Sequence, residues 1–320
     1  LVVSAVLADA PRSKNAAPQL RLPGGVTVVD YDISLKLIPG AETFTGQMII
    51  NLKIAPEAAA EVLWLNGSPD LDIQKVTLSP AAGGEVAPEI IVPAPPDFIG
   101  FRFRNRVSAG PSTLRISYRG KLLRHEGVGL FNERDGNDDY IFSDFEPFDA
   151  RRAFPCFDEP AQKVPVRFTL DVPAAHVAVS NAPIESEQPL PEGLRRVVFR
   201  KTPPLPTYLW AIAVGPFGVV DAGVGGSKRV PLRILTLRGR EAQGRYAASV
   251  TAPLVDILER YTGVPFPYDK LDQVGVPNQG HAMENPGLIT YGQRLILIGP
   301  DSDTVNARRR FARVCAHELA

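Results

Sequence analysis

Alternating hydrophobic and polar residues dominate the first two thirds of the chain. The clearest examples are residues 31–37 and 48–54. Shorter runs of the same kind cover residues 114–118, 166–170 and 197–199. A period of two is typical of a strand with one buried face, and Pro- and Gly-rich turns separate the runs. We therefore predict an antiparallel, sandwich-like β domain over residues 21–220.

The hydrophobic period changes near residue 225. Hydrophobic side chains then recur three or four positions apart, at Tyr246, Val250, Leu254, Ile257, Leu258 and Tyr261. This spacing places them on one face of a helix, which Pro253 either kinks or delays. Residues 304–320 show a second helical pattern, with a basic triplet at residues 308–310 on its solvated face. A second, α-containing domain is therefore predicted from residue 221 onward.

Composition narrows the range of partners. The 320 residues include 35 Lys+Arg and 35 Asp+Glu, so no net charge attracts the chain to nucleic acid or anionic lipid. With 44% hydrophobic and 22% charged residues, the composition is typical of a globular protein. Residues 202–220 are uncharged but contain four prolines, which favours a buried strand between turns. No transmembrane segment is predicted.

The two ends of the sequence favour a fragment of a longer protein. The chain begins at Leu1 rather than Met, and it stops at Ala320 inside a predicted helix. Residues 1–20 are interpreted as a flexible N-terminal segment or as the remnant of a signal peptide. A secreted, periplasmic or membrane-attached location is therefore one alternative, and the cytoplasm is the other.

The last predicted helix ends in His317-Glu318-Leu319-Ala320, which fills four of the five positions of the motif His-Glu-x-x-His. In that motif, two imidazoles one helical turn apart bind one Zn²⁺, and the glutamate takes a proton from the attacking water. Only half of this arrangement is present, because the sequence stops where the second His would stand. The His317-Glu318 pair by itself is as consistent with a chance occurrence as with a metal site.

Residues 280–291 supply the context that the short motif lacks. They contain Ala282-Met283-Glu284-Asn285 and closely resemble the Gly-Ala-Met-Glu-Asn exopeptidase signature of the aminopeptidase N family of gluzincin metallopeptidases. Residues 261–272 and 145–160 resemble two further blocks of that family, and the resemblance runs from about residue 26 to the end. It implies a mostly β, saddle-like antiparallel sandwich domain, followed over residues 221–320 by the start of an α+β thermolysin-like catalytic domain.

The resemblance also implies roles for individual residues. Glu284 and Glu146 are expected to bind the free, cationic α-amine of a peptide, and His317 is expected to be a zinc ligand. Glu318 is the expected general base, which deprotonates the attacking water and passes the proton to the leaving amine. The implied activity is removal of N-terminal residues from peptides, with one Zn²⁺ per complete site. The remaining ligands are expected beyond Ala320, so the fragment by itself is expected to be inactive.

Further residues are expected to line the path of the substrate. The backbone of Ala282 and Met283 is expected to lie beside the substrate like an added strand. His281 stands where the family usually has Gly, and it is either a substrate contact or a substitution tolerated beside Gly280; no spacing supports it as a metal ligand. Asp144 occupies a position often held by Gln in the family, which changes the expected side-chain pocket.

Two other functions stay open. A non-catalytic binding or scaffold member of the same fold would use the surface for partners, although both the His-Glu pair and the exopeptidase Glu are present. A lipid epoxide hydrolase would use the same zinc site, and His281 is the residue that favours it. The expected substrates are peptides with a free N-terminus, and nucleic acid is not an expected partner. The side-chain preference and the oligomeric state stay open.

The remaining polar and sulfur-containing residues are given structural roles. Cys156 and Cys315 lie far apart in the sequence, which excludes a disulfide framework, and both are predicted to be buried packing thiols. Asp158 and Glu159 are predicted to form a buried or half-buried ionic network with the arginine pair 151–152 behind the site.

Overall fold

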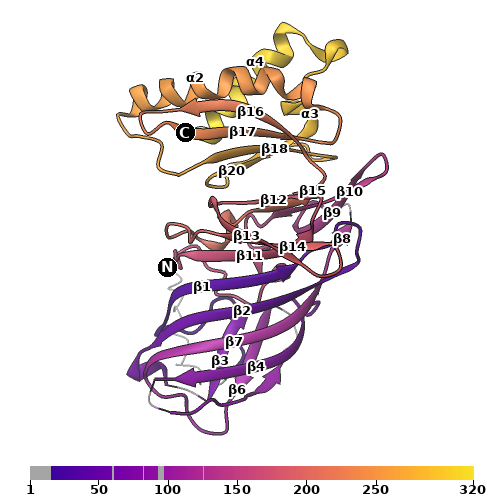
Figure 1. Cartoon of the computed structure of the whole chain (residues 1–320). Helices are drawn as coiled ribbons and strands as arrows, with labels where there is room; N and C mark the ends of the chain where they lie inside the picture. The colour runs from indigo at the N-terminus through magenta and orange to yellow at the C-terminus, as the bar shows by residue number, and fades with distance from the viewer. Residues whose placement is uncertain (1–15, 60, 82, 93–96, 125) are drawn as a thin grey trace, which may run out of the picture.

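The protein consists of two stacked parts in the computed structural model, which describes residues 16–59, 61–81, 83–92, 97–124 and 126–320. Figure 1 shows the N-terminal strands in the lower part and helices α2 and α4 over the last sheet in the upper part. Most of the predicted N-terminal segment or signal remnant, residues 1–20, lies outside the described residues.

The largest sheet of the lower part has seven strands in the order β13-β14-β11-β1-β2-β7-β4. They are β1 (Val26–Lys36), β2 (Thr43–Ile54), β4 (Asp72–Pro80), β7 (Gly110–Lys121), β11 (Val166–Pro173), β13 (Ile184–Leu190) and β14 (Leu194–Phe199). Neighbouring strands are antiparallel except β1 and β11, which are parallel. The alternating sequence runs fall on these strands with their hydrophobic side chains buried, which confirms the predicted strands.

Two smaller sheets complete the lower part, in the orders β12-β15-β10-β9-β8 and β3-β6-β5. Their strands are β3 (Val62–Asn66), β5 (Glu89–Ile91), β6 (Phe98–Arg102), β8 (Leu123–Arg124), β9 (Gly129–Asp135), β10 (Asp138–Asp144), β12 (Val177–Ser180) and β15 (Ile212–Gly215), with short helices η1 (Pro56–Ala58), α1 (Ala150–Ala153) and η2 (Thr207–Leu209) between strands.

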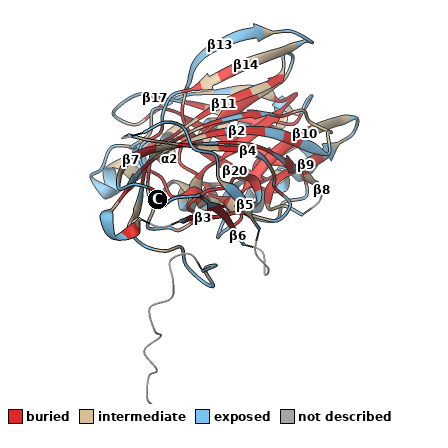
Figure 2. Ribbon diagram, turned by 90° about the horizontal axis from the view of Figure 1, so that it is seen from below, coloured by how far each residue is buried: buried red, intermediate tan, exposed pale blue. Residues whose placement is uncertain are grey.

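One hydrophobic cluster draws side chains from all three sheets. At its centre, the ring of Trp210 packs edge to face against Tyr31 and Phe168, with centroids 5.0 and 5.9 Å apart. Figure 2 shows buried residues running through the sheets, whereas β13 is exposed at the margin.

The uncharged stretch of residues 202–220 contains a strand rather than a long helix. Its central strand, β15, is buried over its whole length and pairs with β10 and β12. This confirms the predicted buried strand. Among the described residues, no helix is long and apolar enough to cross a membrane.

The upper part contains a five-stranded sheet in the order β16-β17-β18-β20-β19. Its elements are β16 (Gly218–Gly225), β17 (Val230–Thr236), η3 (Glu241–Gly244), α2 (Arg245–Thr262), β18 (Leu271–Val276), β19 (Ala282–Met283), β20 (Leu288–Gly292), α3 (Gln293–Ile296), η4 (Pro300–Ser302) and α4 (Val305–Leu319). Strands β17, β18 and β20 are parallel, whereas β16 and β19 pair antiparallel at the two edges. A mostly β N-terminal part is thus followed by the start of an α+β part, as predicted.

Helix α2 confirms the predicted helix and corrects part of its predicted buried face: Tyr246, Val250 and Leu254 are partly buried against the core, as predicted, but they are not its innermost residues. Pro253 lies inside the helix and neither ends nor delays it. The fully buried positions are Ala247, Thr251 and Val255, whereas Ile257 and Tyr261 are 50% and 87% exposed. Small side chains face the sheet because the helix lies close to it: a Cβ at Gly225 would come within 3.2 Å of the Val255 Cβ. Hydrophobic spacing alone could not show this close approach.

Helix α4 agrees with the predicted helix over residues 304–320. The Oγ1 of Thr304 caps its start by accepting a hydrogen bond from the main-chain nitrogen of Ala307 at 3.1 Å. Phe311 and Cys315 are completely buried on the inner face, and the basic triplet 308–310 is exposed on the outer face, as predicted. The burial of Cys315 holds the last turn of α4 against the sheet.

Candidate active site

The motif residues converge on one cavity from separate segments. His317 and Glu318 lie at the end of α4, and Glu284 directly follows the edge strand β19. All three line a cavity of about 580 Å³, whose other walls come from the end of α2 and from residues 264–268. Glu146 approaches from the lower part, two residues after β10, and directly follows the buried Phe145. Phe145 is held by edge-to-face packing on another aromatic ring.

The carboxylates of Glu284, Glu318 and Glu146 interact electrostatically, although only Glu284 and Glu318 line the cavity. Burial, followed by the negative charge of Glu284, raises the pKa of Glu318. Burial, followed by the charges of Glu284 and Asp144, likewise raises the pKa of Glu146. The Oε2 of Glu318 is buried and has no hydrogen-bond partner among the described residues. This concentration of negative charge favours a cationic group in the site.

His281 forms an ion pair with Asp144 across the two parts of the molecule. The Nε2 of His281 lies 2.9 Å from the Oδ2 of Asp144. The imidazole is 60% exposed and the carboxylate only 7%. The hydrogen bond to Asp144 raises the pKa of His281, although partial burial opposes the shift. Both residues that depart from the family pattern therefore contact each other beside Glu146.

Strand β19 presents an open edge to the site. Ala282 pairs with Tyr291 and Met283 with Thr290, and the carbonyl of His281 accepts a hydrogen bond from Gly292 at 2.8 Å. Hydrogen-bonded and non-hydrogen-bonded pairs alternate along an antiparallel ladder. The main-chain N–H and C=O of Ala282 therefore face away from β20. A free edge of this kind can pair with an extended peptide.

Sequence reasoning missed the residues that hold the turn after Glu284. This turn, Pro286-Gly287, is bonded to the side chains of Asn181 and Lys270, both of which are buried. Asn181 belongs to a short polar turn and Lys270 directly precedes a strand, so neither stands out in the sequence. A proline follows Asn181 two positions later, which is common to many turns, and Lys270 lies within the family-like block of residues 261–272, whose resemblance gave it no role of its own.

The residues given structural roles lie mostly where they were predicted. Cys156 and Cys315 are buried free thiols, and burial raises the pKa of Cys315 to about 11. Arg151 forms the predicted ion pair with Asp158, with Nε and Oδ2 2.9 Å apart. Glu159 and Arg152 were wrongly placed in that network. Glu159 accepts a hydrogen bond from the main-chain nitrogen of Leu22, and Arg152 pairs with Glu126 and Asp149.

The described residues contain no group of three or more His, Cys, Asp or Glu side chains arranged to hold a metal ion. Of the described residues that line the cavity, His317 is the only histidine. Its exposed imidazole and the unpartnered Oε2 of Glu318 at one cavity fit one ligand and one acid–base group of a catalytic metal site. They do not make a complete site.

Comparison with known proteins identifies related chains. The Peptidase M1 N-terminal domain model matches residues 28–209, and the Peptidase family M1 domain model matches residues 246–320. The chain is 35% identical to Aminopeptidase M1-A of Oryza sativa subsp. japonica, 33% to Aminopeptidase M1 of Arabidopsis thaliana and 30% to Glutamyl aminopeptidase of Bos taurus. These matches cover 94%, 94% and 93% of this chain but only 35%, 34% and 32% of the relatives. The chain thus spans about a third of the length of the curated relatives it matches.

Proposed function

The chain belongs to peptidase family M1, the aminopeptidase N family of metallopeptidases, and on this basis we propose that the whole protein is a zinc-dependent aminopeptidase. It would remove single residues from the free N-terminus of peptides. The observation that carries the proposal is the shared environment of Glu146, Glu284 and Glu318, which come from three separate segments. The names of the relatives support peptide substrates, because each is called an aminopeptidase.

The α-amine of the substrate is proposed to bind between Glu284 and Glu146. Burial, and after it the negative charge of Glu284, raises the pKa of Glu146, so a cation between the two carboxylates would relieve their repulsion. A peptide with a blocked N-terminus carries no such charge and would bind poorly. The main chain of the substrate would pair with the open edge at Ala282, which orients the first peptide bond toward Glu318.

Glu318 is proposed as the general base. Its raised pKa moves it toward the neutral range, in which a base is most effective. His317, exposed at the end of α4, is proposed as a zinc ligand. When bound, zinc would supply a Lewis acid for the peptide carbonyl and the attacking water. A catalytic zinc site usually has three protein ligands, so residues 1–320 alone are expected to bind zinc weakly and to be inactive.

The alternatives from the sequence, a non-catalytic scaffold and a lipid epoxide hydrolase, gain no support from the relatives found. Removal and return of the metal tests the proposed function directly. The whole protein should lose turnover of a free-amine peptide after prolonged chelation and regain it with Zn²⁺, whereas Mg²⁺ should not restore it. Full turnover in excess chelator would contradict the proposal.

A further inference from the structure

The two carboxylates proposed to bind the amine belong to different parts of the molecule. Glu146 follows β10 in the lower part, and Glu284 follows β19 in the upper part. Figure 1 shows these parts stacked, with β12 and β15 facing the sheet that contains β18 and β20. The separation of the two carboxylates therefore depends on what joins the parts. An apolar cluster that includes Phe142, Ala213 and Val274 fills much of the junction, and buried polar contacts join the parts at the turn after Glu284.

Asn181, which directly follows β12, makes the first connection. Its Nδ2 donates to the carbonyl oxygens of Leu209 and Pro286, each at 2.9 Å, and its Oδ1 accepts from the main-chain nitrogen of Ala211 at 2.8 Å. Asn181 is 5% exposed. Its amide is thus saturated by main-chain groups, of which Leu209 and Ala211 belong to the lower part and Pro286 belongs to the turn after Glu284.

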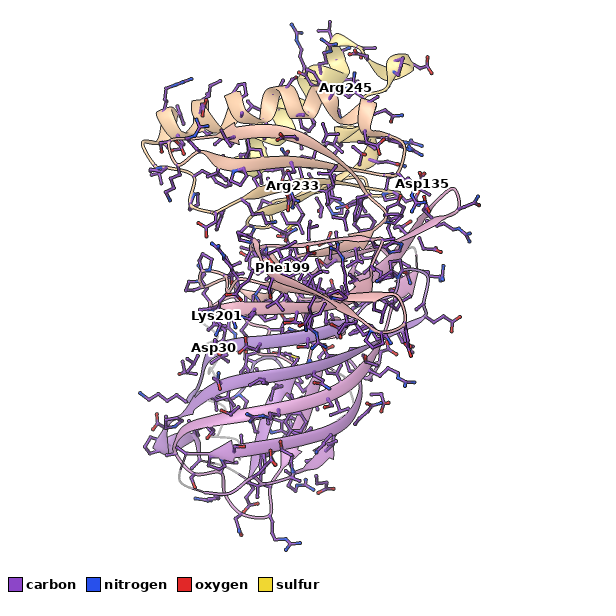
Figure 3. The ribbon with its side chains drawn as sticks, viewed as in Figure 1. Asp30, Asp135, Phe199, Lys201, Arg233 and Arg245 are labelled. Carbon is purple, nitrogen blue, oxygen red and sulfur yellow. The ribbon has the colours of Figure 1, made fainter. Side chains whose placement is uncertain are left out.

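Lys270 makes the second connection. Its Nζ donates to the carbonyl of Gly287 at 2.7 Å, to Oδ2 of Asp272 at 2.8 Å and to the carbonyl of Ser180 at the end of β12. Asp272 is 1% exposed, and Arg233 binds it through two nitrogens at 2.7 and 2.9 Å. Figure 3 shows Arg233 at the junction of the two parts. A buried charge network of this kind holds its geometry because breaking one pair leaves another charge unpaired.

The turn at Gly287 is pressed against the lower part. Gly287 has a φ of 73°, and a Cβ at this position would lie 2.2 Å from the carbonyl oxygen of Asn181. The turn therefore requires glycine both for its backbone conformation and for the close approach. Glu284 lies three residues before this contact, with only Asn285 and Pro286 between, so little chain is available to absorb a shift.

We propose that Asn181 and Lys270 are positioning residues that hold Glu284 at the distance from Glu146 that the substrate amine requires. This inference rests on the proposed function. The His281–Asp144 pair lies at the opposite end of β19, so the short strand is attached to the lower part on both sides. Of the two attachments, the Asn181 and Lys270 contacts are buried, whereas the His281 imidazole is 60% exposed.

The test compares two ligands that differ only in the amino group. Trialanine carries the free amine, and propionyl-dialanine is the same peptide without it. For the whole protein with its metal, kcat and KM are measured with trialanine, and the inhibition constant Ki is measured with propionyl-dialanine. We expect Asn181→Ala and Lys270→Met to raise the KM for trialanine by at least about threefold, and the Ki by less than about twofold, because only the amine loses its aligned partners.

Two further variants keep the result interpretable. Asn181→Ser retains a small polar side chain and provides a milder lesion if the alanine variant does not fold. Thr202→Val is the matched control: Thr202 is buried in the lower part, where its Oγ1 accepts from the main-chain nitrogen of Val166 at 3.0 Å, and it does not line the cavity. It should leave the ratio of KM to Ki at the wild-type value.

The outcomes separate this inference from the proposed function. Glu284→Gln is the reference, because it removes the amine contact directly and should raise the KM for trialanine without raising the Ki. If wild type bound both ligands equally well, the proposed function would fail. The positioning role is tested once wild type and Glu284→Gln behave as expected. It would be overturned if the folded Asn181 and Lys270 variants raised KM and Ki by the same factor, or if they changed neither constant.

Discussion

The two parts of the molecule are stabilised in different ways. The lower part buries hydrophobic faces of three sheets around aromatic rings such as Trp210 and Phe168. The upper part has a smaller hydrophobic cluster, and polar contacts lie beside it: the Nε2 of Gln273 donates to Thr251 at 2.7 Å, and Asp272 lies beside its cationic partners. Buried polar side chains such as Asp158 occur in the lower part too. The upper part also leaves Tyr261 87% exposed. The difference teaches that the lower part provides the larger hydrophobic core, whereas the charged groups proposed for chemistry come from both parts and meet where the parts join.

The sharpest test of this contrast is a substitution that should abolish most of the catalytic turnover while both parts stay folded. Glu318→Gln keeps the shape of the side chain but removes the proposed base. We expect turnover to fall about a hundredfold to ten-thousandfold, since general acid–base groups typically contribute that much. Steady-state kinetics and metal content of the whole protein provide the measurement. Near-normal turnover would show that Glu318 is not the base.

The second test compares burial in the two parts directly. Phe168 is 1% exposed in the lower part, and Phe168→Ala should lower the free energy of unfolding by about 3–5 kcal/mol. Tyr261→Ala in the upper part should change it by no more than about 0.5 kcal/mol, because that side chain is already in water. Denaturant unfolding of both variants measures the difference. Equal losses would mean that Tyr261 is covered in solution.

The third test concerns recognition of the substrate across the junction. Glu284→Ala should reduce kcat/KM for a free-amine peptide by at least about tenfold, because a charge-assisted hydrogen bond is lost. For an N-acetylated version of the same peptide, which lacks the positive charge, the relative loss of kcat/KM should be much smaller. Glu146→Ala should shift selectivity in the same direction but more weakly, since Asp144 lies close by. Equal losses on both peptides would assign Glu284 to the fold rather than to the amine.

The smallest expected effect is a pH dependence at the His281–Asp144 pair. The hydrogen bond to Asp144 raises the folded-state pKa of His281 above its usual value, so the pair stabilises the folded protein at low pH and this contribution is lost as the pH rises through the raised pKa. An NMR titration should place the imidazole midpoint above about 6.5, the usual histidine value. Asp144→Asn should lower the midpoint, whereas Asp149→Asn should not. An unchanged midpoint in Asp144→Asn would show that the pair does not form in solution.

Much of the fold could be predicted from hydrophobic spacing, because burial of one face imposes a period on each strand and helix. Residues 31–37 and 48–54 are examples in the lower part, and α4 is one in the upper part. The buried face of α2 could be predicted only in part. Its small residues Ala247 and Thr251 are inward because Gly225 lets the helix approach the sheet, and that proximity is a property of packing.

The sequence by itself determined the mostly β lower part, the helices of the upper part and the motifs that identified Glu146, Glu284 and Glu318 as candidates. Each of these depends on residues that are close together in the chain. Only the tertiary structure decided that His281 pairs with Asp144 and that Asn181 and Lys270 hold the turn after Glu284. The partners are separated by 137, 105 and 17 positions, and a polar side chain carries no periodic signal of which distant main-chain group will satisfy it once water is excluded.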